Sequence, residues 1–264
     1  MLFAPFLAGG CAVYARFVEP YWFDLSYTRI PLGLPKPIRL LHISDLHVSD
    51  GVAPAQLTKA VAMGLATLPD VICLTGDFVT STIGYDAEAL RHMIRMAAGT
   101  APTFAVMGNH DGGHWMKSWG GDDSSRRMQD LVAGCGARVL HNRSEGWSGL
   151  RFVGTGDLMA KECRPAEAFA GVSGVEPVVV LCHNPDGKDS LTAYRWQLML
   201  SGHTHGGQVR VGPGLAPWLP VMDKRFVAGL YQWKGRQLFI SRGAGSPKHV
   251  RFGCRPEIAV LELT

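Results

Sequence analysis

A short stretch of three residues carries the side chains of an acid–base or metal site. Asn109, His110 and Asp111 directly follow the apolar run 103–106. The amide oxygen of Asn109 is a ligand for a hard cation, the His110 imidazole can move a proton near neutral pH, and a carboxylate such as Asp111 can orient that imidazole. Gly-Asn is also a common turn sequence, so this stretch alone does not establish a site.

Similar side chains follow four other apolar runs. The runs 39–44, 71–75, 178–182 and 197–201 predict buried strands, as does 103–106. Because ligands of open α/β sheets bind beyond the carboxyl ends of the strands, we expect the side chains there to converge. Period-two spacing further predicts that Asp45 and His47 point to one side of their strand. The candidate ligands at the five ends are Asp45, His47, Asp77, Asn109, His183, His203 and His205.

This set of donors favours divalent cations. It contains carboxylate, amide and imidazole groups without cysteine. Such donors suit first-row divalent ions with oxygen and imidazole ligands, and they differ from the thiolates of a closed zinc site. Seven ligands exceed the need of one metal. A carboxylate that bridges two cations about 3.5–4 Å apart is a common arrangement for phosphoester chemistry.

The five blocks resemble those of the calcineurin-like metallophosphoesterases, in the same order, over about residues 39–205. They read Asp45-x-His47, Gly76-Asp77, Gly108-Asn109-His110-Asp111, His183 and Gly202-His203-x-His205. The resemblance implies an α/β fold of four layers (αββα), with two mixed sheets packed face to face and helices outside. It also implies two divalent cations, with Mn²⁺ expected first and Fe, Zn or Mg as alternatives.

The resemblance also implies roles for individual residues. Asp45, His47 and His205 would hold one cation, Asn109, His183 and His203 the other, and Asp77 would bridge both. His110 would be the general acid and Asp111 its partner. A hydroxide bridging the metals would then attack a phosphodiester or pyrophosphate.

Outer motifs resemble one bacterial subgroup of the family, the YaeI/YkuE type, which is related to the chlamydial UDP-2,3-diacylglucosamine pyrophosphatase. These motifs are Glu19-Pro20, Gly206-Gly207-Gln208 and the tail from Ser241-Arg242-Gly243 to Arg255-Pro256-Glu257. A lipid-linked substrate such as UDP-2,3-diacylglucosamine, in lipid A synthesis, is therefore one expectation. The alternatives are a general phosphodiesterase for small soluble substrates and a metal-bearing scaffold without activity. A β-lactamase-like hydrolase would need a dense His-x-His-x-Asp-His cluster, which this sequence lacks.

Loops near the predicted site offer substrate contacts. The glycine-rich segment 112–125 is predicted to be a lid, and an apolar mouth for acyl chains would use Trp115, Trp119, Leu215, Trp218, Leu219 and Val221. Arg242, Lys248 and Arg251 are candidates for binding a nucleotide. In the alternative interpretation, these loops pack on the core and the basic residues are solvated.

The composition indicates one domain, 19–264, preceded by an apolar, anchor-like segment, 1–18. The apolar start carries no charge before Arg16 and is shorter than the about 20 residues of a membrane span, so it predicts peripheral or anchored membrane association, with a buried helix as the alternative. Six scattered cysteines favour a reducing compartment, either the cytoplasm or the cytoplasmic face of a bacterial inner membrane. The net charge of +4 is too small to indicate nucleic-acid binding.

Overall fold

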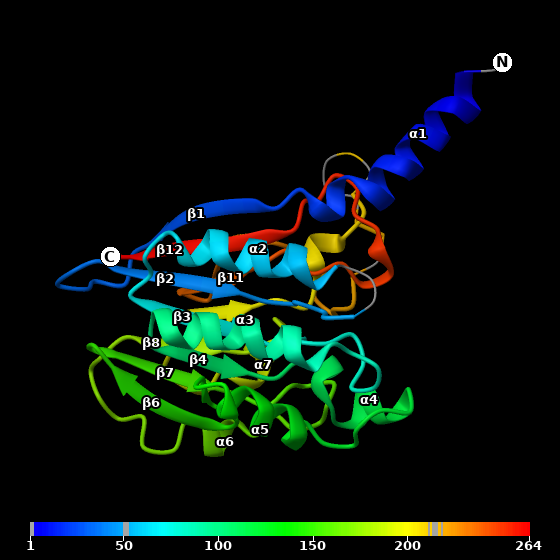
Figure 1. Ribbon diagram of the computed structural model, residues 1–264. Helices are drawn as coiled ribbons and strands as arrows, with labels where there is room; N and C mark the ends of the chain where they lie inside the picture. The colour runs from blue at the N-terminus through cyan, green and yellow to red at the C-terminus, as the bar shows by residue number, and fades with distance from the viewer. Residues whose placement is uncertain (1–2, 50–52, 211, 213–215, 218) are drawn as a thin grey trace.

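Two six-stranded mixed sheets form the centre of the protein in a computed structural model, which describes residues 3–49, 53–210, 212, 216–217 and 219–264 (Figure 1). The first sheet has the order β1 (Asp24–Ile30), β12 (Glu257–Leu263), β2 (Ile38–Ile43), β3 (Val71–Thr75), β4 (Thr103–Val106) and β5 (Arg138–Val139). The second has the order β10 (Gly229–Trp233), β11 (Arg236–Ile240), β9 (Leu198–Ser201), β8 (Val178–Leu181), β7 (Leu150–Gly154) and β6 (Arg143–Trp147). The predicted pair of mixed sheets flanked by helices is confirmed.

Three buried apolar layers separate these sheets and helices. Between the two sheets, the rings of Phe104 from β4 and Phe152 from β7 stack with centroids 4.5 Å apart. Successive residues of a strand face opposite sides, so Leu40 joins this middle layer while Leu41 packs beneath the helices of the first sheet. A third layer, which includes Trp196, covers the far face of the second sheet.

The helices begin and end where their sequences direct. Two longer helices cover the first sheet, α2 (Pro54–Leu65) and α3 (Ala87–Thr100). The helical spacing of their apolar residues predicts both, over 54–66 and 86–98. Pro54 is the first residue of α2, where a backbone N–H would have no helical partner, so proline's lack of an N–H costs nothing. The Asp86 carboxylate caps α3 by accepting a bond from the Ala89 N–H at 2.9 Å. The shorter helices are α4 (His114–Ser118), α5 (Arg126–Gly134), α6 (Pro165–Ala168) and α7 (Gly187–Ser190), with the 3-10 turns η1 (Glu19–Tyr21), η2 (Asn109–Asp111), η3 (His205–Gly207) and η4 (Pro247–His249).

The N-terminal helix α1 (Phe3–Phe17) extends away from the sheets, as Figure 1 shows. Its base is tied to the C-terminal part of the chain. The Arg251 N–H donates to the Ala15 carbonyl at 2.9 Å, the Tyr14 ring meets the edge of Phe252, and the Glu19 carboxylate accepts the Gly253 N–H at 3.0 Å. Among the described residues, no helix combines the length and apolar character needed to cross a membrane.

Besides the five runs named above, β-rich runs at 21–32, 150–154, 237–241 and 258–263 predict strands, but no such run predicts β5, β6 or β10. Each lies at an edge of its sheet, where one side of the strand has no neighbouring strand. Their residues are only partly buried, so they lack the long apolar runs that identified the inner strands.

Candidate metal centre

The carboxyl ends of five strands meet at one rim, where the predicted side chains come together. Asp45 and His47 follow β2, Asp77 follows β3, and Asn109 and His110 lie in η2 after β4. From the second sheet, His183 follows β8, and His203 and His205 follow β9. Apart from the partly exposed His110, these side chains are buried.

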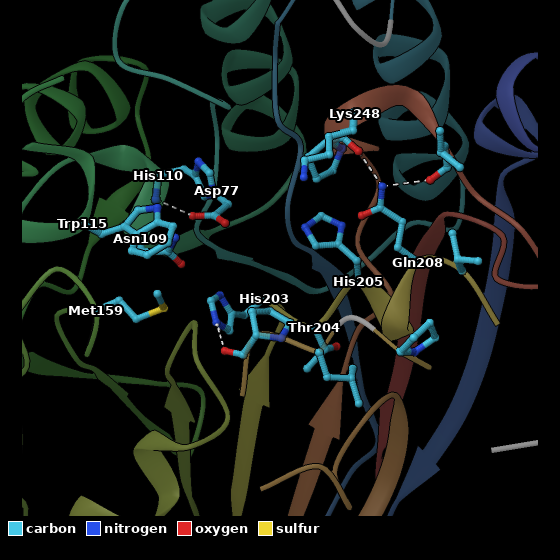
Figure 2. A pocket seen from close by; sticks show the side chains of 16 residues that line it. Asp77, Asn109, His110, Trp115, Met159, His203, Thr204, His205, Gln208 and Lys248 are labelled. Carbon is cyan, nitrogen blue, oxygen red and sulfur yellow. Dashed lines mark hydrogen bonds between the residues drawn. The ribbon is translucent and has the colours of Figure 1, made fainter. Parts of the chain in front are cut away.

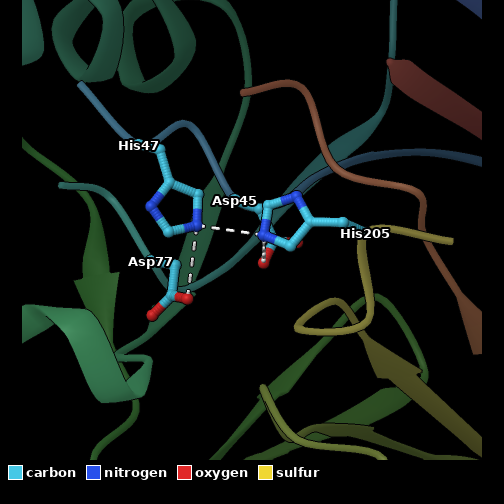
Figure 3. A group of neighbouring side chains, drawn as sticks. All are labelled: Asp45, His47, Asp77 and His205. Carbon is cyan, nitrogen blue, oxygen red and sulfur yellow. Dashed lines mark hydrogen bonds and ion pairs between the residues drawn. The ribbon is translucent and has the colours of Figure 1, made fainter. Parts of the chain in front are cut away.

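One cluster of ligand atoms combines Asp77 with three residues that we call the Asp45 group: Asp45, His47 and His205 (Figure 3). The Nε2 atoms of His47 and His205 are 3.0 Å apart, and His47 Nε2 is 3.4 Å from Asp77 Oδ2. His205 Nε2 is 3.5 Å from Asp45 Oδ1. One ligand atom from each of these residues lies within 4.8 Å of all the others.

A second cluster combines Asp77 with His183 and His203, which we call the His183 group. His183 Nε2 lies 3.2 Å from Asp77 Oδ2 and 3.2 Å from His203 Nδ1. The same carboxylate oxygen of Asp77 therefore faces both groups.

The arrangement fits two bound cations. With metal–ligand distances of about 2.0–2.2 Å, neighbouring ligand atoms in one coordination sphere stand about 3–3.5 Å apart, the separation seen in both clusters. Two buried oxygens, Asp45 Oδ2 and Asn109 Oδ1, have no hydrogen-bond partner within the described chain. A buried acceptor without a partner is costly, and a cation would satisfy both oxygens. The family resemblance had assigned Asn109 to the same cation as the His183 group.

The protonation of the imidazoles also suits ligand binding. Burial lowers the pKa of His47 and His203 to about 3 and also lowers the pKa of His205. These three rings are therefore neutral at pH 7. Burial acts in the same direction on His183, but the Asp77 carboxylate outweighs it and raises the pKa of His183 well above its usual value.

Tight turns, rather than strand alternation, aim the ligands. Asp45, His47 and Asp77 have φ of 54°, 48° and 51°, and His203 and His205 have φ of 68° and 50°. These are left-handed conformations, which cost non-glycine residues of order 1–3 kcal/mol each. Asp45 and His47 do face one cluster, as predicted, but period-two spacing is not the reason, because β2 has already ended at Ile43.

Two glycines of the motifs permit these close approaches. A side chain on Gly108 would collide with the Asp77 carboxylate, and one on Gly202 would collide with Ser44 and the Asp45 carboxylate. Because the glycines leave room for these carboxylates, the His110 N–H donates to Asp77 Oδ1 and the His203 N–H donates to Asp45 Oδ1, both at 2.9 Å.

His110 lies at the edge of the metal cluster but not with the partner that was predicted. Its ring centroid is 5.0 Å from that of His47, and its Nδ1 is 2.7 Å from the Thr80 carbonyl. Asp111 is instead fully buried, and its carboxylate accepts the N–H groups of Gly108 and Phe78, each at 2.8 Å. The expected pairing of Asp111 with His110 is wrong, because the carboxylate turns back to close its own loop.

Burial also changes the acidity of the carboxylates. It raises the pKa of Asp45 to about 6 and that of Asp111 to about 8, with the charge of Asp77 adding to both shifts. Burial works to raise the pKa of Asp77 too, but the adjacent His183 and His110 hold it well below its usual value. Asp77 is therefore the most firmly ionised of the three.

A cavity of about 710 Å³ opens over the clusters (Figure 2). Its polar floor contains Asp77, Asn109, His110, His203 and His205. Figure 2 shows Trp115 and Met159 on one side of it and Gln208 and Lys248 on the other. The rest of its described lining is mainly apolar and comprises Thr204, Val209, Pro217, Leu219, Pro220, Pro247 and Val250.

Comparisons with known proteins agree with this geometry. The profile described as "Calcineurin-like phosphoesterase" matches residues 38–207. The chain belongs to the calcineurin-like phosphoesterase family. Membership of this family and the buried Asp/His clusters together indicate two divalent metals. The predicted identification as a metal-dependent phosphohydrolase is confirmed.

Relatives of similar length support the same family. The chain is 37% identical to phosphodiesterase YaeI of Escherichia coli, over 95% of this chain and 92% of that protein. It is 26% identical to the UDP-2,3-diacylglucosamine pyrophosphatase LpxG of Chlamydia trachomatis, over 94% and 92%. It is 27% identical to the metallophosphoesterase YkuE of Bacillus subtilis, over 97% and 91%.

A solved structure gives the fold alone. The NAD nucleotidase NadN of Haemophilus influenzae matches with a TM-score of 0.50 at 14% identity. The match covers 80% of this chain but only 45% of the nucleotidase.

Only part of the apolar mouth that was predicted for acyl chains lines the cavity. Trp115 and Leu219 do, whereas Trp119 is 71% exposed and Val221 is buried. Leu215 and Trp218 lie outside the described residues.

Two of the three predicted nucleotide-binding cations have structural partners instead. Arg242 pairs with Asp24 at 2.6 Å and Glu257 at 3.1 Å. Arg251 is fully buried and donates to the carbonyls of His205, Gly243, Gly245 and Cys254. The prediction of nucleotide binding by Arg242 and Arg251 is therefore wrong.

The sequence analysis missed Met159, which lines the cavity from the loop after β7. Asp157 in that loop is buried and caps the N–H groups of Met159 and Ala160 at 2.7 and 2.9 Å. The sequence Thr155-Gly156-Asp157 after a strand has the same form as the other blocks, so the rule that found those blocks would also have flagged this one.

Proposed function

We propose that this enzyme hydrolyses a phosphodiester or pyrophosphate bond at a dinuclear divalent metal centre. The observation that carries the proposal is the position of one Asp77 oxygen within 3.4 Å of His47 and 3.2 Å of His183, between the two groups. The Asp45 group would hold one cation, Asn109 and the His183 group the other, and Asp77 both. We propose Mn²⁺, because hard oxygen and imidazole donors suit it.

The bound cations would supply Lewis-acid polarisation of the phosphoryl oxygens and a nucleophile from water. The protein contributes the proton. The Thr80 carbonyl accepts from His110 Nδ1, so Nε2 is the atom that exchanges a proton with the leaving oxygen. Because that partner is a neutral carbonyl, we assign Asp111 a role in shaping the loop and not in transferring protons.

Replacing His110 by Ala tests this division of roles. We expect both cations to remain bound, while turnover of an alkyl phosphodiester falls by about 10²–10⁴-fold. Turnover of an aryl phosphodiester should fall less, because a phenolate leaves without a proton. Equal loss on the two esters, or no loss on the alkyl ester, would show that His110 is not the acid.

We further propose a lipid-linked phosphoester as the substrate. The apolar cavity wall and the similarity to a UDP-2,3-diacylglucosamine pyrophosphatase support this. Exposed apolar side chains at the base of α1, among them Val13 and Phe17, support peripheral docking on a membrane, which we place on its cytoplasmic face.

Substrate comparison tests the lipid proposal independently of the hydrolase proposal. The purified enzyme should cleave UDP-2,3-diacylglucosamine with a higher kcat/KM than it cleaves a nucleotide-sugar that lacks acyl chains. Cleavage of simple diesters without cleavage of the acylated substrate would exclude that substrate and leave the hydrolase intact. Val13→Ser with Phe17→Ser should reduce flotation with vesicles that contain anionic lipid.

A further inference from the structure

Lys188 is a buried cation outside the metal clusters. It lies in α7, five residues after His183, and its side chain is only 1% exposed. Its ammonium is 3.0 Å from Asp189, 3.4 Å from Asp223 and 3.7 Å from Asp186. A buried ammonium is costly unless it is paired, and here three carboxylates surround it.

The pairing with Asp223 fastens a second segment of chain, 219–227, to α7. The Asp186 carboxylate, which faces Lys188, also accepts the backbone N–H groups of Met222 at 2.6 Å and Asp223 at 3.2 Å. The Lys188 ammonium lies 5.1 Å from the ring centroid of Phe226, in the same segment. The segment is therefore held by charge, by backbone hydrogen bonds and by an aromatic face.

Segment 219–227 in turn holds the His183 group. The Pro220 carbonyl is 3.0 Å from His203 Nε2, which leaves His203 Nδ1 facing His183 at 3.2 Å. The hydroxyl of Thr204 donates to the Val227 carbonyl at 2.6 Å. The hydrogen bond on the outer nitrogen of an imidazole fixes which nitrogen is free to bind a metal.

We propose that Lys188 is a positioning residue for the metal centre. By joining α7, which follows His183, to the segment that carries Pro220, it keeps the Nδ1 lone pair of His203 turned toward the cation. The inference rests on the proposed dinuclear function. It assigns a role to a lysine that touches neither the candidate ligands nor the cavity.

Lys188→Met removes the charge while keeping an apolar chain against Phe226. We expect metal titration of the apoprotein to show the cation of the His183 group bound about 10–100-fold more weakly, the size typical of outer partners of a metal site. The other cation should keep its affinity. A general loss of stability would weaken the binding of both cations and not of one alone.

Lys234→Met is a matched control. Like Lys188, Lys234 lies over an aromatic ring, since its ammonium is 4.8 Å from the ring centroid of Trp233. Unlike Lys188, it is exposed, on the turn between β10 and β11. This variant should bind both cations with the affinities of the wild type.

Two further readouts do not depend on activity. In the metal-free Lys188→Met protein, amides of 219–227 should exchange hydrogen faster than in the wild type. The ¹⁵N spectrum of His203 should change from one tautomer, with the proton on Nε2, to a mixture. Asp223→Asn, which leaves Lys188 with Asp186 and Asp189, should give smaller changes in the same direction and serves if Lys188→Met does not fold.

The outcomes separate this inference from the proposed function. If the wild type binds no divalent cation, the proposed function fails. If the wild type binds two cations and the folded Lys188→Met protein matches it in both affinities and in exchange at 219–227, the role of Lys188 is wrong while the metal centre stands.

Discussion

The two histidine groups that flank Asp77 are held in different ways. In the His183 group, main-chain carbonyls fix the outer nitrogens: His183 Nδ1 is 2.7 Å from the Thr75 carbonyl, and His203 Nε2 is 3.0 Å from that of Pro220. These contacts do not depend on the identity of the partner side chain. The main chain therefore pre-organises the rings of the His183 group.

The Asp45 group has weaker outer contacts, and these come from side chains. His47 Nδ1 is 3.4 Å from the Thr80 hydroxyl, and His205 Nδ1 is 3.4 Å from the Arg251 guanidinium. A guanidinium has only donors, so it cannot accept a ring N–H. The rings of the His183 group are therefore oriented by main-chain carbonyls, whereas the rings of the Asp45 group depend on the side chains that face them.

The largest effect should come from Asp77→Asn, which removes the carboxylate that the two groups share. The affinity for each cation should fall by more than about 100-fold, a larger loss than is typical when a residue that hydrogen-bonds to a metal ligand is replaced. Hydrolysis should fall to background. Elemental analysis after gel filtration measures the retained metal. Asp86→Asn, at the cap of α3, controls for loss of one carboxylate and should retain both cations. Wild-type metal content in Asp77→Asn would remove the bridging role.

Gly202→Ala should separate the groups. The added methyl would meet Ser44 and the Asp45 carboxylate, so we expect the cation of the Asp45 group to bind about 10–100-fold more weakly and the other cation to remain. Isothermal titration of the apoprotein resolves the two steps. Equal weakening of both would mean that the groups are not independent.

Gly99→Ala is the control for that substitution. Gly99 lies in α3 with nothing within 4 Å of the position of a new Cβ. It should leave metal binding unchanged and raise the free energy of unfolding by about 0.5–1 kcal/mol.

The smallest effect should come from Thr80→Val. This change removes the hydroxyl near His47 but keeps the carbonyl that holds His110, so the cation of the Asp45 group should bind less than about tenfold more weakly. The preference of the enzyme for aryl over alkyl esters should not change. Thr58→Val on α2 is the control. A loss as large as that of Asp77→Asn would show that Thr80 does more than support His47.

Much of the fold followed from local patterns. The inner strands were recognisable because runs such as Val71–Thr75 are buried along their whole length, and α2 and α3 because their apolar residues recur at helical spacing. The edge strand β6, with residues such as Arg143 and Glu145, has no such signature. Its position depends on pairing with β7, which a local pattern does not encode.

For the candidate site, the sequence predicted which residues come together better than it predicted their orientations and roles. The rule that strand ends converge was sufficient to group the seven ligand candidates. It was not sufficient for orientation, because Asp45 and His47 take left-handed turns that strand periodicity does not foresee. The expected roles of Asp111 as the partner of His110 and of Arg251 as a nucleotide ligand also failed, because the polar groups of both residues bond to the main chain.

By itself, the sequence determined which donors stand at the strand ends, their order along the chain, and thus the family. Only the tertiary structure decided how those donors divide around Asp77, which ring nitrogen each histidine turns inward, and that Lys188 joins two distant segments. The physical reason is that side-chain type limits the available chemistry, whereas carbonyl partners such as those of Thr75, Thr80 and Pro220 belong to the main chain. Any residue supplies a carbonyl, so its position is known only once the chain has folded.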